Sequence, residues 1–487
     1  MSWADLNLMP ALPEIVLLCA ALAILIIDLF VKSERRGVTY ALSMLTLIGT
    51  AVAVVASWVP YPVLTFSGMY IADPVSSLSK LGLLVAVGAT FVYARQYAHD
   101  RGFLKGELFT LGLFSLLGMF VMVSASHFLT LYIGLELLSL SLYAMIAMSR
   151  ESIPATEAAM KYFVLGALAS GLLLYGISMV YGATGSLQIS DVAHAIGAGQ
   201  ANTTLVSFGL VFIIAGLAFK LGAVPFHMWV PDVYQGAPTA VTVLIGSAPK
   251  LAAFVFTFRF LAQALAPAAV AWQPMLVILA VASLVLGNLA AIMQTNIKRM
   301  LAYSTISHMG FLLIGILAAS PSGYTAALFY AITYMLTALA SFGILVALSR
   351  AGFECETMDD LKGLNQKNAW YALLVLFAMF SMAGIPPMVG FYAKFAVLKA
   401  AVDAGLLWLA VVGVMMSLIG AFYYLRVVKV VYFDDATDTS SGDKLTIGGD
   451  MKLVLGLNGL ALLVLGVLPN GLYAACLEAM RQSLGGM

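Results

Sequence analysis

The sequence has few charged residues. Asp, Glu, Lys and Arg make up only 10% of its 487 residues, whereas 62% are hydrophobic. Soluble domains carry about 25% charged residues, so this chain lacks the polar side chains needed to cover a water-exposed surface. The composition is that of a protein that crosses the membrane several times.

Candidate cofactor ligands are also scarce. The three cysteines, Cys19, Cys355 and Cys476, lie far apart, and the five histidines are scattered. Iron–sulfur, haem and zinc sites need clustered ligands, and no glycine-rich phosphate loop opens a helix after a strand. We therefore expect no metal, haem or nucleotide on this chain. The net charge of +1 gives no reason to expect a nucleic-acid partner, and the N-terminus does not resemble a cleaved signal peptide.

Long apolar runs fill most of the chain. About 20 apolar residues cross a bilayer core as one helix. The pattern predicts fourteen spans in an all-α polytopic protein, near residues 11–31, 38–59, 75–95, 107–125, 127–149, 156–182, 204–236, 238–262, 274–294, 298–319, 323–349, 368–401, 405–432 and 452–476. We predict one membrane domain over residues 1–487, with three N-terminal helices in 1–100 and a C-terminal helix in 452–487.

Lysine and arginine occur in alternate loops, which predicts the orientation of the chain. Loops on the cytoplasmic side carry the excess of basic residues. The predicted cytoplasmic charges are Lys32, Arg35, Arg36, Arg95, Arg101, Lys105, Arg150, Lys298, Arg299, Arg350, Lys362, Lys367 and Lys444. Both termini would then lie on the opposite, periplasmic side, with Arg481 as the one exception.

Several ionisable residues lie inside the predicted spans. A charge at bilayer depth costs at least about 2.5–3.5 kcal/mol and faces protein or water instead of lipid. Together they predict a buried polar path, formed by Glu136, Lys161, Lys220, Lys250, His308 and Lys394.

Each of these residues also has a plainer interpretation. Lys161 could form a surface pair with Glu157 one turn earlier, and His308 could be a core histidine with satisfied hydrogen bonds. Lys250 and Lys394 could reach the interface as snorkelling side chains. We expect the residues nearer the span ends, Lys80, Lys399, Arg259, Asp28 and Glu14, to be snorkelling or interfacial. His227 could cap backbone groups or relay a proton.

Two of the spans contain internal prolines. Span 7 contains Pro225 and Pro231, and span 12 contains Pro386 and Pro387. Proline breaks a helix, and irregular backbone at membrane depth survives only where protein or a wet cavity surrounds it. The two breaks are five spans apart, which predicts two five-helix units in 105–262 and 274–432. Units with an odd number of spans are inverted relative to each other, and such pairs often bracket an ion path.

A buried lysine next to a carboxylate can act as a proton switch. Burial and a nearby carboxylate act in opposite directions on the proton affinity of a lysine. Glu136 paired with Lys220 is the best candidate in this sequence.

Three segments carry a family resemblance. "FKLGAVPFHMWVPDVYQGAPT", "QTNIKRMLAYSTISHMGF" and "AGIPPMVGFYAKF" resemble the antiporter-like membrane subunits of proton-pumping NADH:quinone oxidoreductase, complex I. The resemblance covers about residues 105 to 430. Lys394 and the end of the chain at Met487 make the pattern most similar to the N type, the counterpart of mitochondrial subunit 2.

The resemblance implies roles for the matching positions. Glu136 would tune Lys220, the proton carrier of span 7, and Lys394 would transfer protons near the exit side. Lys250 and His308, with a possible contribution from Lys161, would form a central axis. NADH, FMN, iron–sulfur clusters and quinone would be bound by other subunits, and the chain would contact neighbouring antiporter-like and small membrane subunits in a bacterial cytoplasmic membrane.

Two other functions share parts of this pattern. Subunits of multisubunit Na⁺/H⁺ antiporters and of membrane-bound hydrogenases have similar broken helices and buried lysines. A purely structural scaffold is a third possibility, although it gives no reason for the buried charges.

Overall fold

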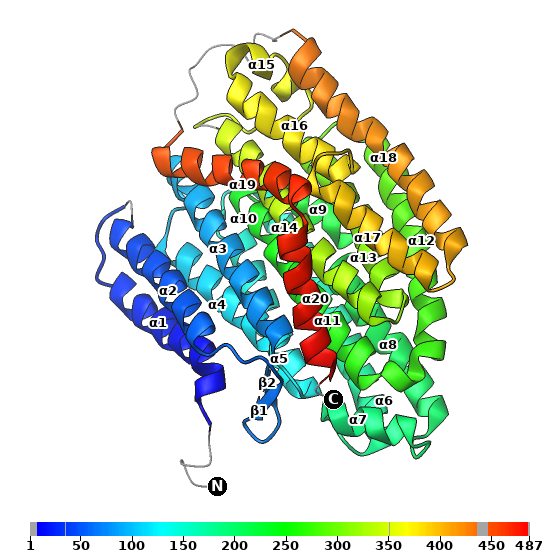
Figure 1. Cartoon of the computed structure of the whole chain (residues 1–487). Coiled ribbons are helices and arrows are strands. Elements are labelled where there is room, and N and C mark those ends of the chain that lie inside the picture. The colour runs from blue at the N-terminus through cyan, green and yellow to red at the C-terminus, as the bar shows by residue number, and fades with distance from the viewer. Residues whose placement is uncertain (1–6, 35, 350, 436–446, 486–487) are drawn as a thin grey trace.

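A computed structural model describes residues 7–34, 36–349, 351–435 and 447–485, and these form one bundle of helices (Figure 1). In this part of the chain, thirteen helices are long and apolar enough to cross a membrane. Predicted span 12 is divided into two shorter helices, Ala369–Ala383 and Val389–Asp403, so the count of fourteen crossings stays a prediction. The structure therefore confirms the all-α polytopic fold. The predicted cytoplasmic residues Arg35, Arg350 and Lys444 lie outside the described residues, as do the first six and last two positions of the predicted domain.

The N-terminal part consists of three spans and a small hairpin that the sequence analysis missed. The hairpin has two antiparallel strands in the register Val63↔Ala72. The elements are η2 (Met9–Ala11), α1 (Leu12–Asp28), α2 (Gly37–Ala56), β1 (Val63–Thr65), β2 (Tyr70–Ala72) and α3 (Pro74–Asp100).

The next part corresponds to the first predicted unit. It includes a short amphipathic helix, α7, that was not predicted. The elements are α4 (Gly106–Val123), α5 (Phe128–Ala147), α6 (Ile153–Thr184), α7 (Ile189–Gly197), α8 (Thr203–Leu221), α9 (Trp229–Gly236), α10 (Thr239–Gly246), α11 (Ala248–Phe258) and the π-helical turn η3 (Arg259–Ala264).

The remaining elements complete the bundle around the long buried helix α14. Predicted span 14 bends at Pro469 into α19 and α20. The elements are η4 (Ala266–Ala268), α12 (Ala269–Ile292), α13 (Ile297–Leu317), α14 (Pro321–Leu348), η5 (Asp359–Leu361), α15 (Leu364–Lys367), α16 (Ala369–Ala383), α17 (Val389–Asp403), α18 (Leu407–Phe433), α19 (Gly449–Val467) and α20 (Asn470–Gly485).

Two helix pairs pack through matched glycines. A Cβ on Gly118 of α4 would lie 2.5 Å from the backbone N of Leu138 on α5, and a Cβ on Gly287 of α12 would lie 2.7 Å from the backbone N of Ser307 on α13. Both residues of the second pair follow those of the first by 169 positions (287 − 118 and 307 − 138). Such close backbone approach needs small residues at the contact. This matched contact is what two related units would produce, and the repeat itself stays a prediction.

Candidate functional site

The break in span 7 begins at the end of α8. Gly222 has φ 83°, and its N–H bonds to the Ala218 carbonyl at 2.8 Å, which ends the helix in a left-handed cap. The Val224–Pro225 bond that follows is cis. Pro231 lies in the first turn of α9. The N–H groups of a first turn have no partner inside the helix, so the helix loses no hydrogen bond when proline takes this position. Pro225 is therefore part of the break, whereas Pro231 is not.

The break in span 12 repeats this geometry. Gly384 ends α16 with φ 82°, and its N–H bonds to the Phe380 carbonyl at 3.0 Å. The Pro386–Pro387 bond is cis, and α17 begins at Val389. Gly384 and Pro387 follow Gly222 and Pro225 by the same 162 positions (384 − 222 and 387 − 225). Both breaks thus place the carbonyl end of a helix inside the bundle.

Lys220 is buried on the last turn of α8. Its Nζ donates to Ser139 Oγ on α5 at 2.8 Å. Glu136 lies on the same helix as Ser139, and its Oε1 is buried without a hydrogen-bond partner. The ion pairs of the described residues do not include Glu136 with Lys220, so the expected direct pairing is not formed in this structure. Ser139, which the sequence analysis missed, is the group that contacts the lysine.

Lys250 lies beside the first break and is 1% exposed. Its Nζ is 3.4 Å from the Lys220 carbonyl and 3.3 Å from the Leu221 carbonyl, at the C-terminal end of α8. It also lies 5.0 Å from the centre of the Trp229 ring. The free carbonyls of a helix end carry partial negative charge and stabilise a cation. Lys250 therefore does not snorkel.

A third helix break positions Lys250. Span 8 was predicted as one helix, but α10 ends at Gly246 and α11 begins at Ala248. Between them Ser247 has φ −116° and ψ −88°, outside the helical region. Pro249, in the first turn of α11, is the signal in the sequence that could have indicated this break.

Lys394 occupies an equivalent place at the second break. Its Nζ donates to the Ala383 carbonyl at 3.0 Å, at the C-terminal end of α16, and to Ser417 Oγ at 2.9 Å. It lies 5.0 Å from the centre of the Phe311 ring. Each broken helix thus presents carbonyl groups to a buried lysine that comes from a later segment of the chain.

His308 lies on α13 between two tyrosine hydroxyls. Its Nδ1 is 2.6 Å from Tyr330 Oη, and its Nε2 is 3.1 Å from Tyr424 Oη. Both ring nitrogens therefore have partners, which agrees with the plainer interpretation of this residue. The same hydroxyls can also exchange protons with the ring, because a hydroxyl both donates and accepts. The tyrosines were not among the predicted site residues.

Two small cavities border these groups. One lies against Ser139, Lys220 and Lys250, and the other lies against His308 and Ser381. Each has a volume of about 10 Å³, close to the smallest space that holds one water molecule.

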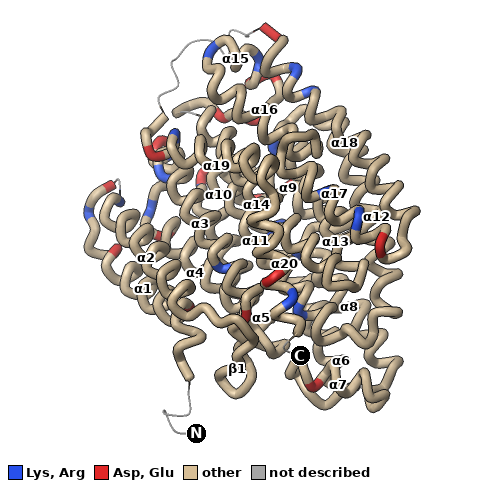
Figure 2. The backbone as a smooth tube through the Cα atoms, viewed as in Figure 1, with Lys and Arg blue, Asp and Glu red and all other residues tan. Residues whose placement is uncertain are grey.

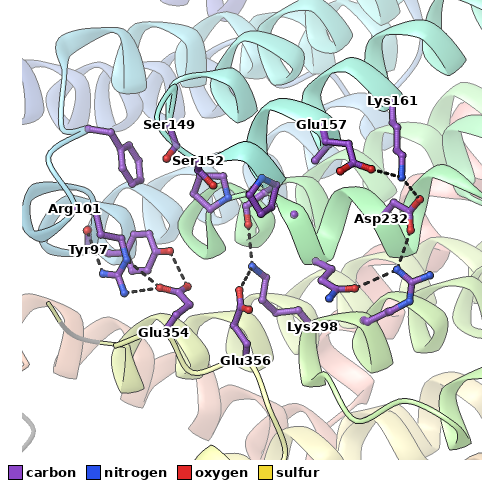
Figure 3. Close-up of a pocket in the computed structure, with 18 residues that line it drawn as sticks. Tyr97, Arg101, Ser149, Ser152, Glu157, Lys161, Asp232, Lys298, Glu354 and Glu356 are labelled. Carbon is purple, nitrogen blue, oxygen red and sulfur yellow. Dashed lines mark hydrogen bonds and ion pairs between the residues drawn. The ribbon is translucent and has the colours of Figure 1, made fainter. Parts of the chain in front are cut away.

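Lys161 does not belong to this buried set. Its side chain is 43% exposed and pairs with Glu157 and Asp232, each at 2.8 Å. These residues line a charged cavity of about 460 Å³, which Figure 3 shows between α6, α9, α13 and the segment around Glu354. The surface-pair alternative describes Lys161 correctly, and its predicted place on the buried path is wrong.

Other charges near span ends also differ from expectation. Lys80 is 2% exposed, and its Nζ lies 2.7 Å from Glu14 Oε1, so Lys80 does not snorkel and both side chains are buried in the bundle. Arg259 is fully buried and paired with Asp73 at 2.8 Å. Lys399 agrees with expectation, because its side chain is 62% exposed.

His227 and Asp28 complete the predicted ionisable residues. His227 lies in the break between α8 and α9, and its Nδ1 is buried with no hydrogen-bond partner among the described residues. Asp28 is partly buried at the end of α1 and accepts a hydrogen bond from Thr39 Oγ1.

The three buried lysines share one property. Lys220, Lys250 and Lys394 contact hydroxyl and carbonyl oxygens, and the ion pairs of the described residues include none of them. A lysine held in this way can gain or lose a proton without breaking an ion pair. The arrangement is suited to proton transfer between fixed sites.

Known proteins are similar to this chain in sequence. A family model described as "NADH:quinone oxidoreductase/Mrp antiporter, TM" matches residues 125–420. A protein of Laribacter hongkongensis named NADH-quinone oxidoreductase subunit N is 81% identical over 485 residues, which cover 100% of each chain. A protein of the same name from Neisseria gonorrhoeae is 55% identical, with 99% of this chain and 100% of that protein covered.

Solved structures share the fold. A chain of respiratory complex I from Thermus thermophilus has a TM-score of 0.83 and 30% identity, with 96% of this chain and 99% of that chain covered. A chain of the Mrp complex from Dietzia sp. has a TM-score of 0.86 at 21% identity, with 97% and 96% covered, which shows the fold alone. The chain therefore belongs to the transmembrane family of NADH:quinone oxidoreductase and Mrp antiporter subunits, and within it to the N subunits of NADH-quinone oxidoreductase.

Proposed function

We propose that this chain translocates protons as a membrane subunit of complex I and carries out no redox chemistry itself. The observation that carries this proposal is the set of three buried lysines whose ammonium groups contact hydroxyl and carbonyl oxygens and aromatic rings, and which are in none of the ion pairs of the described residues. Moving one charge against a membrane potential requires roughly 2.3 kcal/mol per 100 mV. Changes in hydration or in the Glu136 charge next to such lysines can supply energies of this size.

The proposed path uses groups from both halves of the bundle. Lys220 carries the proton in the first half, and Glu136, one turn from Ser139, biases its charge. Lys250 and His308 continue the path through the centre, and Lys394 transfers the proton toward the exit side. Lys161 is left out because its side chain lies at the rim of the charged cavity.

The partner subunits complete the enzyme in this proposal. They would hold NADH, FMN, the iron–sulfur clusters and quinone, and quinone reduction there would change the charge or hydration around Lys220. Neighbouring antiporter-like and small membrane subunits would contact helices on the outside of the bundle. The complex would lie in a bacterial cytoplasmic membrane, with both termini of this chain on the periplasmic side. The antiporter and hydrogenase alternatives are not favoured, since the full-length relatives are N subunits.

Two lysine substitutions test the proposal in inside-out membrane vesicles. Lys220→Ala should abolish most NADH-driven acidification of the vesicle interior. Lys399→Ala is the matched control and should leave acidification unchanged, because this lysine is exposed and forms a surface pair with Asp403 at 2.7 Å. Blotting for the assembled complex shows whether each variant is present in normal amounts. Normal acidification by an assembled Lys220→Ala complex would contradict the proposed role.

A further inference from the structure

The connection between α9 and α10 is a sharp joint at the charged end of the bundle. The helix α9 ends at Gly236, Pro238 follows, and α10 begins at Thr239. Helix ends leave backbone carbonyl and N–H groups without helical partners, and these groups need other partners when they are buried. Ala237 and Thr239 are 1% and 0% exposed. Their free backbone groups are bonded by side chains from distant helices.

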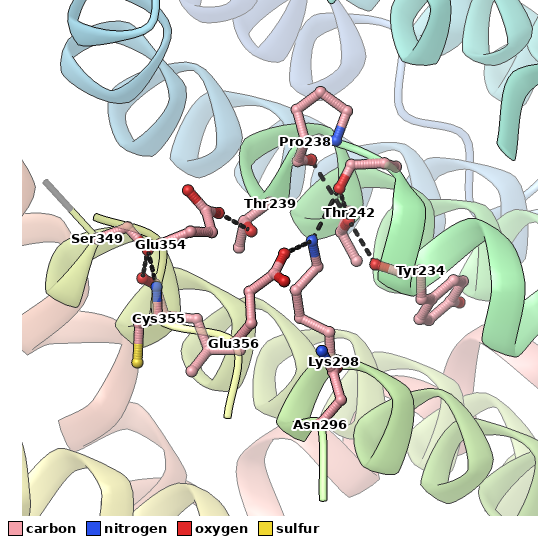
Figure 4. Close-up of polar contacts among 12 residues, drawn as sticks. Tyr234, Pro238, Thr239, Thr242, Asn296, Lys298, Ser349, Glu354, Cys355 and Glu356 are labelled. Carbon is pink, nitrogen blue, oxygen red and sulfur yellow. Dashed lines mark hydrogen bonds and ion pairs between the residues drawn. The ribbon is translucent and has the colours of Figure 1, made fainter. Parts of the chain in front are cut away.

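Lys298 holds the α9 side of the joint. It lies in the first turn of α13 and is 1% exposed, although the sequence analysis placed it among the loop charges. Its Nζ donates to the Ala237 carbonyl at 2.9 Å and lies 3.2 Å from Glu356 Oε1 (Figure 4). The Glu356 carboxylate balances the charge of the buried Lys298 ammonium. The ammonium in turn supplies a hydrogen bond to the Ala237 carbonyl at the end of α9.

Tyr97 holds the α10 side of the joint. The backbone N–H of Thr239 donates to Tyr97 Oη at 3.1 Å, and Tyr97 Oη donates to Glu354 Oε1 at 2.7 Å. Thr239 Oγ1 also donates to Glu354 (Figure 4). Arg101 Nε donates to the other carboxylate oxygen of Glu354 at 2.9 Å, so this carboxylate is fully bonded (Figure 3).

Both carboxylates come from one short segment, residues 353–358, which we call the strap. Glu354 and Glu356 are two positions apart and reach the joint, while Cys355 between them is fully buried on the other side. Backbone bonds fasten the strap to the start of α13: Ile297 N–H to the Glu356 carbonyl at 2.7 Å, and Met358 N–H to the Thr295 carbonyl at 3.1 Å. The strap thus connects the end of α14 with α3, α13 and the joint.

The joint separates two parts of the proton-transfer site. The helix α9 carries Trp229, whose Nε1 donates to the Phe219 carbonyl at 2.9 Å and whose ring lies 5.0 Å from Lys250 Nζ. The helix α10 leads directly to the break before Lys250. A change of angle at the joint would therefore move Trp229 relative to Lys250.

We propose that the strap, acting through Lys298 and Tyr97, positions the joint and thereby sets the place of Lys250 against Trp229 and the end of α8. Lys298 and Tyr97 are positioning residues in this proposal and do not carry the proton. The proposal rests on the proton-translocating function described above. In this proposal the strap, in the second half of the chain, controls the geometry of the helix break before Lys250, in the first half.

The test uses the intact purified complex and two measurements. Hydrogen–deuterium exchange followed by mass spectrometry reports the opening of backbone amides in residues 233–246. NADH-driven acidification per NADH oxidised, in reconstituted vesicles, reports coupling. The variants are Lys298→Met, Lys298→Arg and Tyr97→Phe. Asp359→Asn is the matched control, because this exposed residue beyond the strap pairs with the nearby Lys362, at 2.6 Å.

Lys298→Met and Tyr97→Phe should each increase exchange in residues 233–246 and lower the proton yield by at least about twofold. Lys298→Arg should restore both values, because a guanidinium can donate to the Ala237 carbonyl and to Glu356. Asp359→Asn should change neither. If Lys298→Met does not assemble, Tyr97→Phe still tests the joint from the other side.

Unchanged exchange in both variants would overturn the positioning role. Increased exchange with an unchanged proton yield would show that the joint is structural only, and would also overturn the proposal. A failure of the proposed function can be distinguished from a failure of this positioning role. In that case Lys220→Ala would also leave the proton yield unchanged, whatever the hydrogen–deuterium exchange in residues 233–246.

Discussion

At the scale of single residues, Arg259 and Asp73 are two buried charges that form an ion pair. Both side chains are 0% exposed. Arg259 Nη2 donates a hydrogen bond to Asp73 Oδ1, and Nη1 lies in ion-pair contact with Oδ2, each at 2.8 Å. Arg259 also donates to the Val123 carbonyl at 3.0 Å and to Gln263 Oε1 at 3.0 Å. The arginine was expected to snorkel because it lies near a span end. Only the position of α3, which brings Asp73 to it, makes burial possible.

Asp73→Asn tests this buried pair. The amide can still accept the bond from Ser76 N–H that caps α3, so the substitution removes mainly the charge. An uncompensated buried guanidinium should destabilise the chain by about 3–5 kcal/mol. We expect a lower thermal unfolding midpoint of the purified complex and less complex in the membrane.

Asp403→Asn serves as the control for Asp73→Asn. Asp403 forms an exposed pair with Lys399, which should contribute no more than about 1 kcal/mol. Equal effects of the two substitutions would mean that the burial of Asp73 does not decide its contribution.

At the scale of elements, the two broken helices share one design. A left-handed glycine ends the first half-helix, a cis proline lies three residues later, and a lysine from another segment contacts the free carbonyls. The prolines made both breaks predictable. The partners of the lysines were not predictable, because Ser139 on α5, the carbonyls at the end of α8 and Ser417 on α18 lie on other helices than Lys220, Lys250 and Lys394.

Gly384→Ala should damage the second break. The residue has φ 82°, and an added Cβ would lie 2.9 Å from Lys394 Cδ. A left-handed conformation costs a non-glycine residue about 1–2 kcal/mol, so we expect that loss of stability together with lower proton pumping as Lys394 is displaced. Thermal unfolding and vesicle acidification measure the two effects.

Gly171→Ala is the matched control on α6. A Cβ there would meet nothing within 4 Å, and alanine is favoured over glycine in a helix by about 1 kcal/mol. This variant should be as stable as the parent or more stable. A Gly384→Ala complex that behaves like the Gly171→Ala complex would show that the glycine cap is dispensable.

At the scale of the whole molecule, the charges are distributed unevenly between the two ends of the bundle. Figure 2 shows many Lys and Arg residues at the end that carries α15, and few at the end that carries β1 and α7. The start of α1 and the end of α20 lie toward this second end (Figure 1). By the bias of basic residues toward the cytoplasm, we predict that the α15 end faces the cytoplasm.

Single cysteines test this orientation. Ser190→Cys on α7 should react with a membrane-impermeant maleimide in intact spheroplasts, whereas Asp359→Cys should react only in inverted vesicles. Ser190 and Asp359 are both exposed at opposite ends of the bundle. The reverse pattern of labelling would contradict the predicted orientation and the periplasmic location of the termini.

The sequence by itself determined the spans, the two proline breaks and the presence of charges inside the membrane. These features depend on local properties, namely apolar length, the missing N–H of proline and the cost of a charge in lipid. The tertiary structure decided which charges are paired: Lys161 at a surface rim, Lys80 with Glu14, Arg259 with Asp73, and Lys220 with Ser139 instead of Glu136. It also revealed the break before Lys250 and the strap that holds Lys298. Pairing depends on the packing of helices that are distant in sequence, and no local pattern specifies that packing.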